Sequence, residues 1–183
     1  ITRDTPNPNG GRIDHDPNTG EPMGSLQDEA MGLVNSKAPP YTAKERQDGL
    51  RSALKMLNGF GITSFQDASV DTDALETYRA LDEAGQLSAR VVASLWWERK
   101  KGEEQIAGFV ESRRKYTRGR LRATTVKIMQ DGVMENYTAV VLEPYKLKDR
   151  KDVRGIPMVE PELLKQAVTQ LDKDGFQVHF HAI

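Results

Sequence analysis

The chain has 183 residues, of which 37% are hydrophobic, and its 26 basic residues nearly balance 27 acidic ones for a net charge of −1. This length suits one domain with a modest core, and the near-neutral charge argues against binding to nucleic acid or anionic membranes by bulk electrostatic attraction. Because the chain has no cysteine, it can form neither a disulfide nor a thiolate zinc site.

No apolar stretch reaches the length of a membrane span, and residues 1–30 lack the hydrophobic region of a signal peptide. We therefore expect no membrane partner, and both the cytoplasm and the periplasm stay open as locations. The chain also begins with Ile rather than Met, which suggests a processed or truncated sequence.

Residues 1–41 are rich in Pro, Gly, Asn and Asp, which are turn-forming residues. They leave room for little regular structure beyond a short hairpin around Asn18–Gly20. We predict that residues 1–41 form a turn-rich segment of the same domain as residues 42–183, with no second independent domain.

Helix and strand patterns alternate from residue 42 onward. Thr42 and Glu45 form a capping box, which predicts the start of a helix that ends near Gly59. The patterns that follow predict strands at 61–67, 89–97, 121–129 and 176–183, and helices at 73–84, 103–116 and 161–174. A loop of more than twenty residues separates the third strand from the last helix.

The first three strands recur at intervals of about thirty residues, the length of one βα unit, so the fold class is α/β with a parallel sheet. Four strands suit either an open doubly wound sheet or half of a (β/α)₈ barrel. No Gly-rich phosphate loop follows the first strand, which weighs against a nucleotide-binding sheet. In a barrel, chemistry lies at the carboxyl ends of the strands, where this chain carries Asp67, Trp96-Trp97, Asp131 and His181.

Two of the three histidines, His179 and His181, lie on the last predicted strand. Strand side chains alternate between faces, so these two point the same way, about 6.6 Å apart along the strand. Paired neutral imidazoles suit a metal such as zinc. The alternative is that one or both are hydrogen-bonded residues of the inner barrel face.

Lys127 and Asp131 form a second polar group at the end of the third predicted strand. Lys127 lies between Val126 and Ile128 and therefore faces away from both. It is either a functional lysine or an ordinary strand lysine with its ammonium in solvent. Asp131 could be a metal ligand, a residue that orients a ligand, or the cap of the turn made with Gly132.

Five segments, in order along the chain, resemble the YtcJ-like branch of the metal-dependent amidohydrolase superfamily, the group that includes N-substituted formamide deformylase. They are Thr5-Pro with Gly10–Ile13, Gly20–Gly24, Leu57–Ala68, Val126–Val133 with Thr138-Ala139, and Gly175–Ile183. The resemblance implies a TIM-type (β/α)₈ barrel, of which this chain would supply about four consecutive βα units.

The resemblance also implies a site. A lysine at the position of Lys127 can be carboxylated by CO₂ to bridge metal ions, and burial favours the neutral amine that this requires. The metal would be one or two divalent ions, most simply zinc, held by Lys127 with His181 or His179. We prefer His181, which lies closer to the carboxyl end of its strand, and give His179 an orienting or substrate-contacting role.

Further candidates for orienting ligands or contacting substrate are Asp131, Glu135 and Trp97. Trp96 and Trp97 fall on opposite faces of their strand, so only one can line a pocket, with core packing as the alternative for either. The family's catalytic aspartate and its first-strand His-x-His pair have no counterpart here and would lie outside residues 1–183. The isolated chain is therefore expected to be inactive.

The expected reaction is hydrolysis of a carbon–nitrogen bond other than a peptide bond in a small-molecule substrate. One rival is a non-catalytic α/β module that self-associates as a homo-oligomer through open sheet edges. A second rival is a small enzyme that uses Lys127 and Asp131 without metal, as a Schiff-base lysine does.

Overall fold

The computed structural model describes residues 1–8, 10–148 and 152–183. They group into two compact units. The sheet unit comprises Tyr41–Gln130 and Pro157–Ala182, and the turn-rich unit comprises Ile1–Pro40, Asp131–Ile156 and Ile183. Residues 131–156 thus group with the N-terminal segment, while the proposed boundary at residue 41 stays a prediction. No helix in the described ranges is both long enough and apolar enough to span a membrane.

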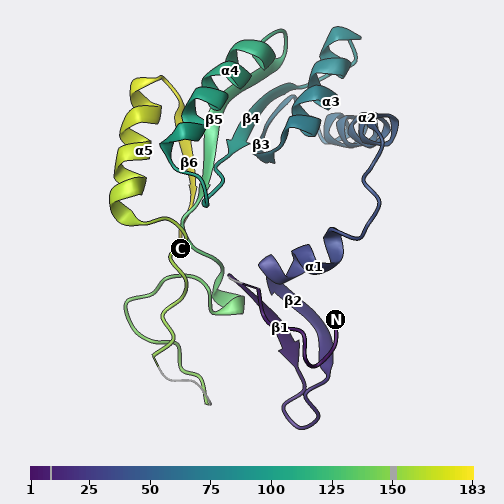
Figure 1. The fold of residues 1–183 in the computed structure, drawn as a ribbon. Coiled ribbons are helices and arrows are strands. Elements are labelled where there is room, and N and C mark those ends of the chain that lie inside the picture. The colour runs from purple at the N-terminus through teal and green to yellow at the C-terminus, as the bar shows by residue number, and fades with distance from the viewer. Residues whose placement is uncertain (9, 149–151) are drawn as a thin grey trace. The chain divides into compact units, whose positions relative to one another are not determined.

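The sheet unit contains the expected parallel sheet. Its strands are β3 (Ser64–Val70), β4 (Arg90–Trp96), β5 (Leu121–Met129) and β6 (Gln177–His181), which lie side by side in that order (Figure 1). Each neighbouring pair is parallel, as the alternation of strand and helix patterns predicted. The fold class of the chain is therefore α/β.

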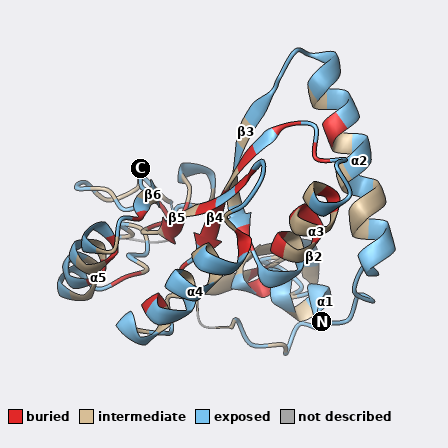
Figure 2. Ribbon diagram, turned by 90° about the horizontal axis from the view of Figure 1, so that it is seen from above, coloured by how far each residue is buried: buried red, intermediate tan, exposed pale blue. Residues whose placement is uncertain are grey.

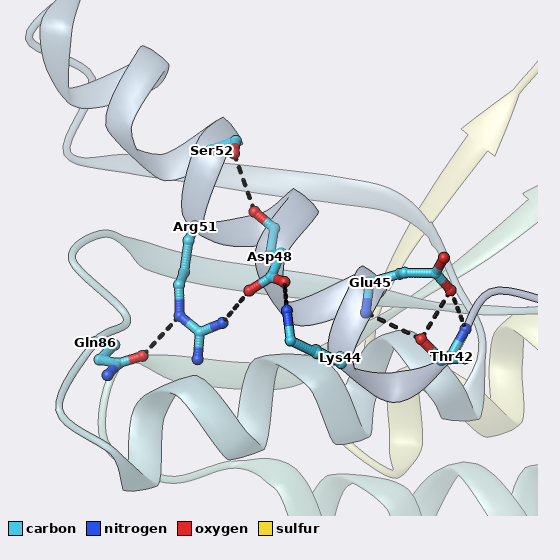
Figure 3. Close-up of polar contacts among 7 residues, drawn as sticks. All are labelled: Thr42, Lys44, Glu45, Asp48, Arg51, Ser52 and Gln86. Carbon is cyan, nitrogen blue, oxygen red and sulfur yellow. Dashed lines mark hydrogen bonds and ion pairs between the residues drawn. The ribbon is translucent and has the colours of Figure 1, made fainter.

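Four helices connect and cover these strands: α2 (Ala43–Gly59), α3 (Thr72–Glu83), α4 (Ile106–Tyr116) and α5 (Pro161–Lys173), with a short 3₁₀ turn η2 (Glu103–Gln105) before α4. The predicted capping box opens α2, because Thr42 Oγ1 accepts from Glu45 N and the Glu45 carboxylate accepts from Thr42 N (Figure 3). Arg51 on the same helix donates to Gln86 Oε1 (Figure 3). Glu160 caps α5, and Pro161 takes the first helical position, where its missing N–H costs nothing.

The core of the sheet unit lies between the sheet and these helices. Helices α3 and α4 contact β5, α5 contacts β6, and α2 contacts α3. Buried residues gather on β4, β5 and α3 in Figure 2. Leu81 of α3 and Leu171 of α5 are almost fully buried, and burial of each side chain is worth about 1.5–3 kcal/mol.

The first strand of the sheet begins three residues later than predicted. Gly61 adopts φ +75°, and Ile62 N donates to Leu57 O, which closes α2 with a Schellman-type turn. This turn occupies residues 60–62, so β3 begins at Ser64. As a result, Asp67 lies within β3 rather than at its carboxyl end, which corrects the predicted position.

The sheet is curled, with the helices on its outer face. Gln66 Nε2 on β3 lies 3.2 Å from His179 Nδ1 on β6, although β4 and β5 lie between these strands. In a flat sheet the backbones of β3 and β6 would be about 14 Å apart. Side chains on the concave face converge, so the short contact identifies the face that carries Gln66 and His179 as concave. We call it the inner face.

The turn-rich unit contains an antiparallel hairpin, β1 (Gly11–His15) and β2 (Pro22–Asp28). The hairpin predicted around Asn18–Gly20 is confirmed, and Asp16 Oδ1 accepts from Asn18 N and Thr19 N within its turn. The unit also holds short helical turns that the sequence did not indicate: η1 (Glu29–Met31), α1 (Gly32–Asn35) and η3 (Met134–Asn136).

Candidate active site

One row of side chains crosses the inner face near the carboxyl ends of the strands. Lys127 of β5 pairs in register with Trp96 of β4 on one side and with His179 of β6 on the other. Paired residues of neighbouring parallel strands project from the same face. Val126 and Ile128, the neighbours of Lys127 in sequence, are buried in the core on the other face. The strand pairing thus places Lys127 beside His179, as the sequence required for a shared site.

Lys127 is a buried cation without a counter-charge. Its side chain is only 7% exposed, and its ammonium makes no hydrogen bond or ion pair with any residue that the structure describes. Burial lowers the pKa of Lys127, because a charged ammonium loses hydration there. The neutral amine is therefore easier to reach than in a solvent-exposed lysine.

His179 shares this environment. Burial lowers the pKa of the His179 ring, and the positive charge of Lys127 lowers it further. Both effects favour the neutral imidazole, which can accept a hydrogen bond or bind a metal. His179 Nδ1 is in contact with Gln66 Nε2, which also donates to Ser94 Oγ at 2.9 Å.

Gln66 is the site residue that sequence reasoning missed. The predicted polar residue of β3 was Asp67, on the assumption that it ended the strand. Asp67 instead faces the helices, where it accepts a hydrogen bond from the Tyr78 hydroxyl at 2.8 Å. Burial, together with this carboxylate, raises the pKa of Tyr78. Phe65 also packs against Tyr78, so the alternation along β3 places Gln66 on the opposite, inner face.

His181 lies one strand period beyond His179 and pairs in register with Met129. Its backbone carbonyl accepts from Gln130 N at 3.0 Å. Its side chain is partly exposed and, by strand alternation, projects from the same face as His179. Of the two histidines, His181 is therefore the one nearer to the carboxyl end of the sheet.

Trp97 lies in the core rather than on the inner face. It is 2% exposed, and its ring packs against Phe109 of α4 with the centroids 6.1 Å apart. Trp96, which is 40% exposed, is the tryptophan in the row of Lys127. The two tryptophans do fall on opposite faces, as alternation predicted, and Trp96 is the one on the side of the polar residues.

Asp131 and Glu135 belong to the turn-rich unit. Asp131 is 2% exposed and accepts backbone hydrogen bonds from Val140 at 2.9 Å and from Ile183 at 3.3 and 3.4 Å. These bonds favour the turn-holding interpretation of Asp131. Glu135 is exposed in η3. Burial and the charges of Asp131 and Glu135 together raise the pKa of Tyr145.

Within the described ranges, no group of three or more histidine, aspartate and glutamate side chains is arranged to hold a metal ion. The side chains that suit a metal are Lys127, buried without a partner, and the histidines of β6 on the same face. A carbamate on Lys127 would add two oxygens that share one negative charge. The donor chemistry of the inner face is thus compatible with a divalent ion.

The model of the amidohydrolase family matches residues 1–183, the whole chain. The chain is 29% identical to YtcJ of Bacillus subtilis (strain 168), with the whole chain aligned to 34% of that protein. It is 27% identical to the exoenzymes regulatory protein AepA of Pectobacterium carotovorum subsp. carotovorum, again over the whole chain and over 39% of that protein. It is 30% identical to the protein LONG AFTER FAR-RED 3 of Arabidopsis thaliana, over 98% of the chain and 31% of that protein.

Solved structures give a matching fold. An uncharacterized metal-dependent hydrolase from Pyrococcus horikoshii OT3 superposes with a TM-score of 0.66 at 23% identity, over 93% of this chain and 33% of that one. A second, from Pyrococcus furiosus, gives a TM-score of 0.63 over 93% and 34%. The chain therefore spans about a third of the length of the proteins it matches. The family match and the similarity to YtcJ confirm the resemblance that the five sequence segments indicated.

Proposed function

We infer the function of this chain from the family to which it belongs, the amidohydrolase family. We propose that the protein is a metal-dependent hydrolase that cleaves a carbon–nitrogen bond other than a peptide bond in a small molecule. The hydrolase class is supported by the family and by the structurally similar metal-dependent hydrolases. The bond type and the small-molecule substrate go beyond the hydrolase class, and we propose them for the whole protein.

We also propose that the four strands of the sheet unit are consecutive strands of an eight-stranded TIM-type barrel. Their parallel order and the right-handed βα connections expected for such units suit that architecture. The inward curl that brings Gln66 to His179 is the curvature that a closing barrel needs. The row of Trp96, Lys127 and His179 lies toward the carboxyl ends of the strands, where barrel enzymes carry their chemistry.

The observation that carries the proposal is the buried, unpaired Lys127. A buried cation without a partner costs free energy, and ionisable groups in such environments are candidates for a chemical role. Its neutral amine can attack the carbon of CO₂ and lose one proton, which yields an N-carboxylate with two oxygen ligands. Lys127 in this form and His181 would hold one or two divalent ions, with zinc as the proposed metal. When bound, such an ion would lower the pKa of a water molecule and polarise the scissile carbonyl.

The remaining predicted residues take supporting roles in this proposal. Asp131 holds the backbone at Ile183, two residues beyond His181, and so helps to fix the chain next to that ligand. Glu135 is proposed to contact substrate, since it is exposed in the segment that follows β5. Trp97 supports β4 from the core, and Trp96 replaces it as the proposed aromatic contact on the inner face.

The test is metal and carbamate analysis of the purified protein supplied with zinc and ¹³C-labelled bicarbonate. We expect bound zinc by elemental analysis and a carbamate carbon signal by NMR, both lost in Lys127→Met. His181→Gln should lose zinc, whereas His15→Gln, a change of the same type in the turn-rich unit, should retain it. Absence of zinc and carbamate from the unaltered protein would refute the metal site. With an added aldehyde or ketone, a Schiff-base lysine would instead condense through Lys127 with loss of water, and borohydride would trap the imine as a secondary amine.

A further inference from the structure

The Gln66 side chain links three strands of the inner face through one amide group. Its Nε2 atom lies 2.9 Å from Ser94 Oγ on β4 and 3.2 Å from His179 Nδ1 on β6. An amide nitrogen carries two hydrogens and has no lone pair to share, so it donates in both contacts. One N–H group of the amide is thus directed to Ser94 and the other to His179.

A donor at Nδ1 determines where His179 keeps its own proton. The neutral imidazole has one N–H and one acceptor nitrogen. If Nδ1 accepts from Gln66, the proton is on Nε2, and Nε2 has no lone pair for a metal. No described residue makes a hydrogen bond to His179 Nε2.

We propose that Gln66 is a positioning residue that holds His179 as the Nε2–H tautomer, so that His179 donates a hydrogen bond to the substrate's carbonyl oxygen rather than binding metal. The donor role rests on the proposed hydrolase function, whereas the tautomer does not. Hydrolysis of an amide-like bond places negative charge on that oxygen, and a fixed N–H donor stabilises it as the charge develops. His181, one strand period nearer to the carboxyl end of β6, is then the histidine left for the metal.

Histidine NMR tests the tautomer directly, because the protein has only three histidines. In ¹⁵N-labelled protein at about pH 8, above the ordinary pKa of an imidazole, we expect a one-bond N–H coupling at His179 Nε2 and none at Nδ1. Gln66→Glu replaces the donor with a carboxylate acceptor, so the proton should move to Nδ1. Gln66→Met removes both hydrogen bonds and should leave a mixture of the two tautomers.

Gln177→Glu is the matched control. Gln177 lies on the same face of β6, two residues from His179, and its Oε1 accepts from Thr125 Oγ1 at 3.5 Å. The same change of charge at this position should leave the His179 proton on Nε2. An Nδ1–H tautomer in the unaltered protein, or an Nε2–H tautomer that persists in a folded Gln66→Glu variant, would overturn the proposal.

Zinc content tests the role of the ring. His179→Phe should retain the zinc of the unaltered protein, because a ring that donates through Nε2 and accepts through Nδ1 supplies no metal ligand. His181→Phe should lose the zinc. Loss of zinc in His179→Phe would make His179 a ligand and refute the donor role. If no variant and not even the unaltered protein binds zinc, the proposed function fails, and the tautomer measurement still decides the role of Gln66.

Discussion

Among the described residues, each unit buries one charged side chain, and the two side chains differ in their hydrogen bonding. In the turn-rich unit, Asp131 is 2% exposed and accepts hydrogen bonds from two backbone N–H groups. In the sheet unit, Lys127 is 7% exposed and has no such partner among the described residues. A buried charge that is hydrogen-bonded stabilises its surroundings, whereas one without partners costs free energy. The comparison separates a charge that maintains the fold from one that is available for chemistry.

The two units also differ in how they are held together. The core cluster of buried hydrophobic residues lies entirely in the sheet unit. In the turn-rich unit, the hydrophobic residues found buried in the described ranges are Ile13, Ala30 and Ala139. Hydrogen bonds between side chains and the backbone therefore contribute a larger share of the stability of the turn-rich unit. Asn7 Oδ1, for example, accepts from Ile13 N at 2.7 Å, and the Tyr145 hydroxyl donates to Ala139 O at 2.8 Å.

The largest effect should come from removing the satisfied charge. Asp131→Ala leaves the N–H groups of Val140 and Ile183 without their acceptor, at a cost of about 1–3 kcal/mol in the free energy of unfolding. Urea denaturation measures the loss, and faster hydrogen exchange at the Val140 amide would locate it. Asp131→Asn is the matched control, because its carbonyl oxygen can still accept, and it should lose less. Equal stability of all three proteins would show that these bonds contribute nothing.

Removal of the unpaired charge should change the free energy of unfolding in the opposite direction. Lys127→Met keeps a similar length and removes the buried ammonium, so we expect the free energy of unfolding at pH 7 to rise by on the order of 1 kcal/mol. Lys165→Met on the exposed surface of α5 is the control and should stay within about 0.5 kcal/mol of the unaltered protein. A clear destabilisation by Lys127→Met would mean that the lysine is structural, and the contrast with Asp131 would not hold.

A partly exposed cluster of Glu76, Lys115 and Tyr116 should give the smallest effect. Glu76 accepts from Lys115 Nζ at 2.8 Å and from the Tyr116 hydroxyl at 2.7 Å, and these bonds lower the pKa of Glu76. A carboxyl whose folded-state pKa is depressed stabilises the fold above its unfolded pKa, and this contribution is lost as the pH falls through the folded pKa. The stability difference between the unaltered protein and Glu76→Gln should therefore be present at pH 7 and vanish in acid. Because the cluster is partly exposed, the difference should stay within about 1 kcal/mol and shrink in high salt. Unfolding curves at several pH values measure it, and a difference that persists in acid would exclude the charge as its cause.

The sheet could be predicted well from the amino-acid sequence, because the signals that define its strands and helices are local. The capping box at Thr42 and the apolar periodicity of the strands and helices depend on neighbours a few residues away. The facing of Lys127 away from Val126 and Ile128 followed from strand alternation alone. These are the features for which a short window of sequence contains the determining interactions.

The partners of the site residues could not be predicted in the same way. Because of the Schellman-type turn at Gly61, β3 begins three residues later than predicted. Asp67 is therefore not the residue that ends the strand. The prediction therefore selected Asp67 and missed Gln66, whose importance depends on contacts with β4 and β6. Likewise, Trp97 could not be distinguished from Trp96 until the strand register placed Trp96 beside Lys127. The hydrogen bonds that hold Asp131 come from residues 9 and 52 positions away.

The curl of the sheet has a consequence for the order of folding. The contact between Gln66 and His179 joins residues 113 positions apart, with two further strands between them in the sheet. Closing so long a loop is entropically unfavourable until the intervening elements have formed. The contact can therefore form only late, after β4 and β5 have docked. In a partly folded chain that lacks β6 from its sheet, Gln66 cannot reach His179. The proposed tautomer of His179 would therefore be fixed only when β6 joins the sheet.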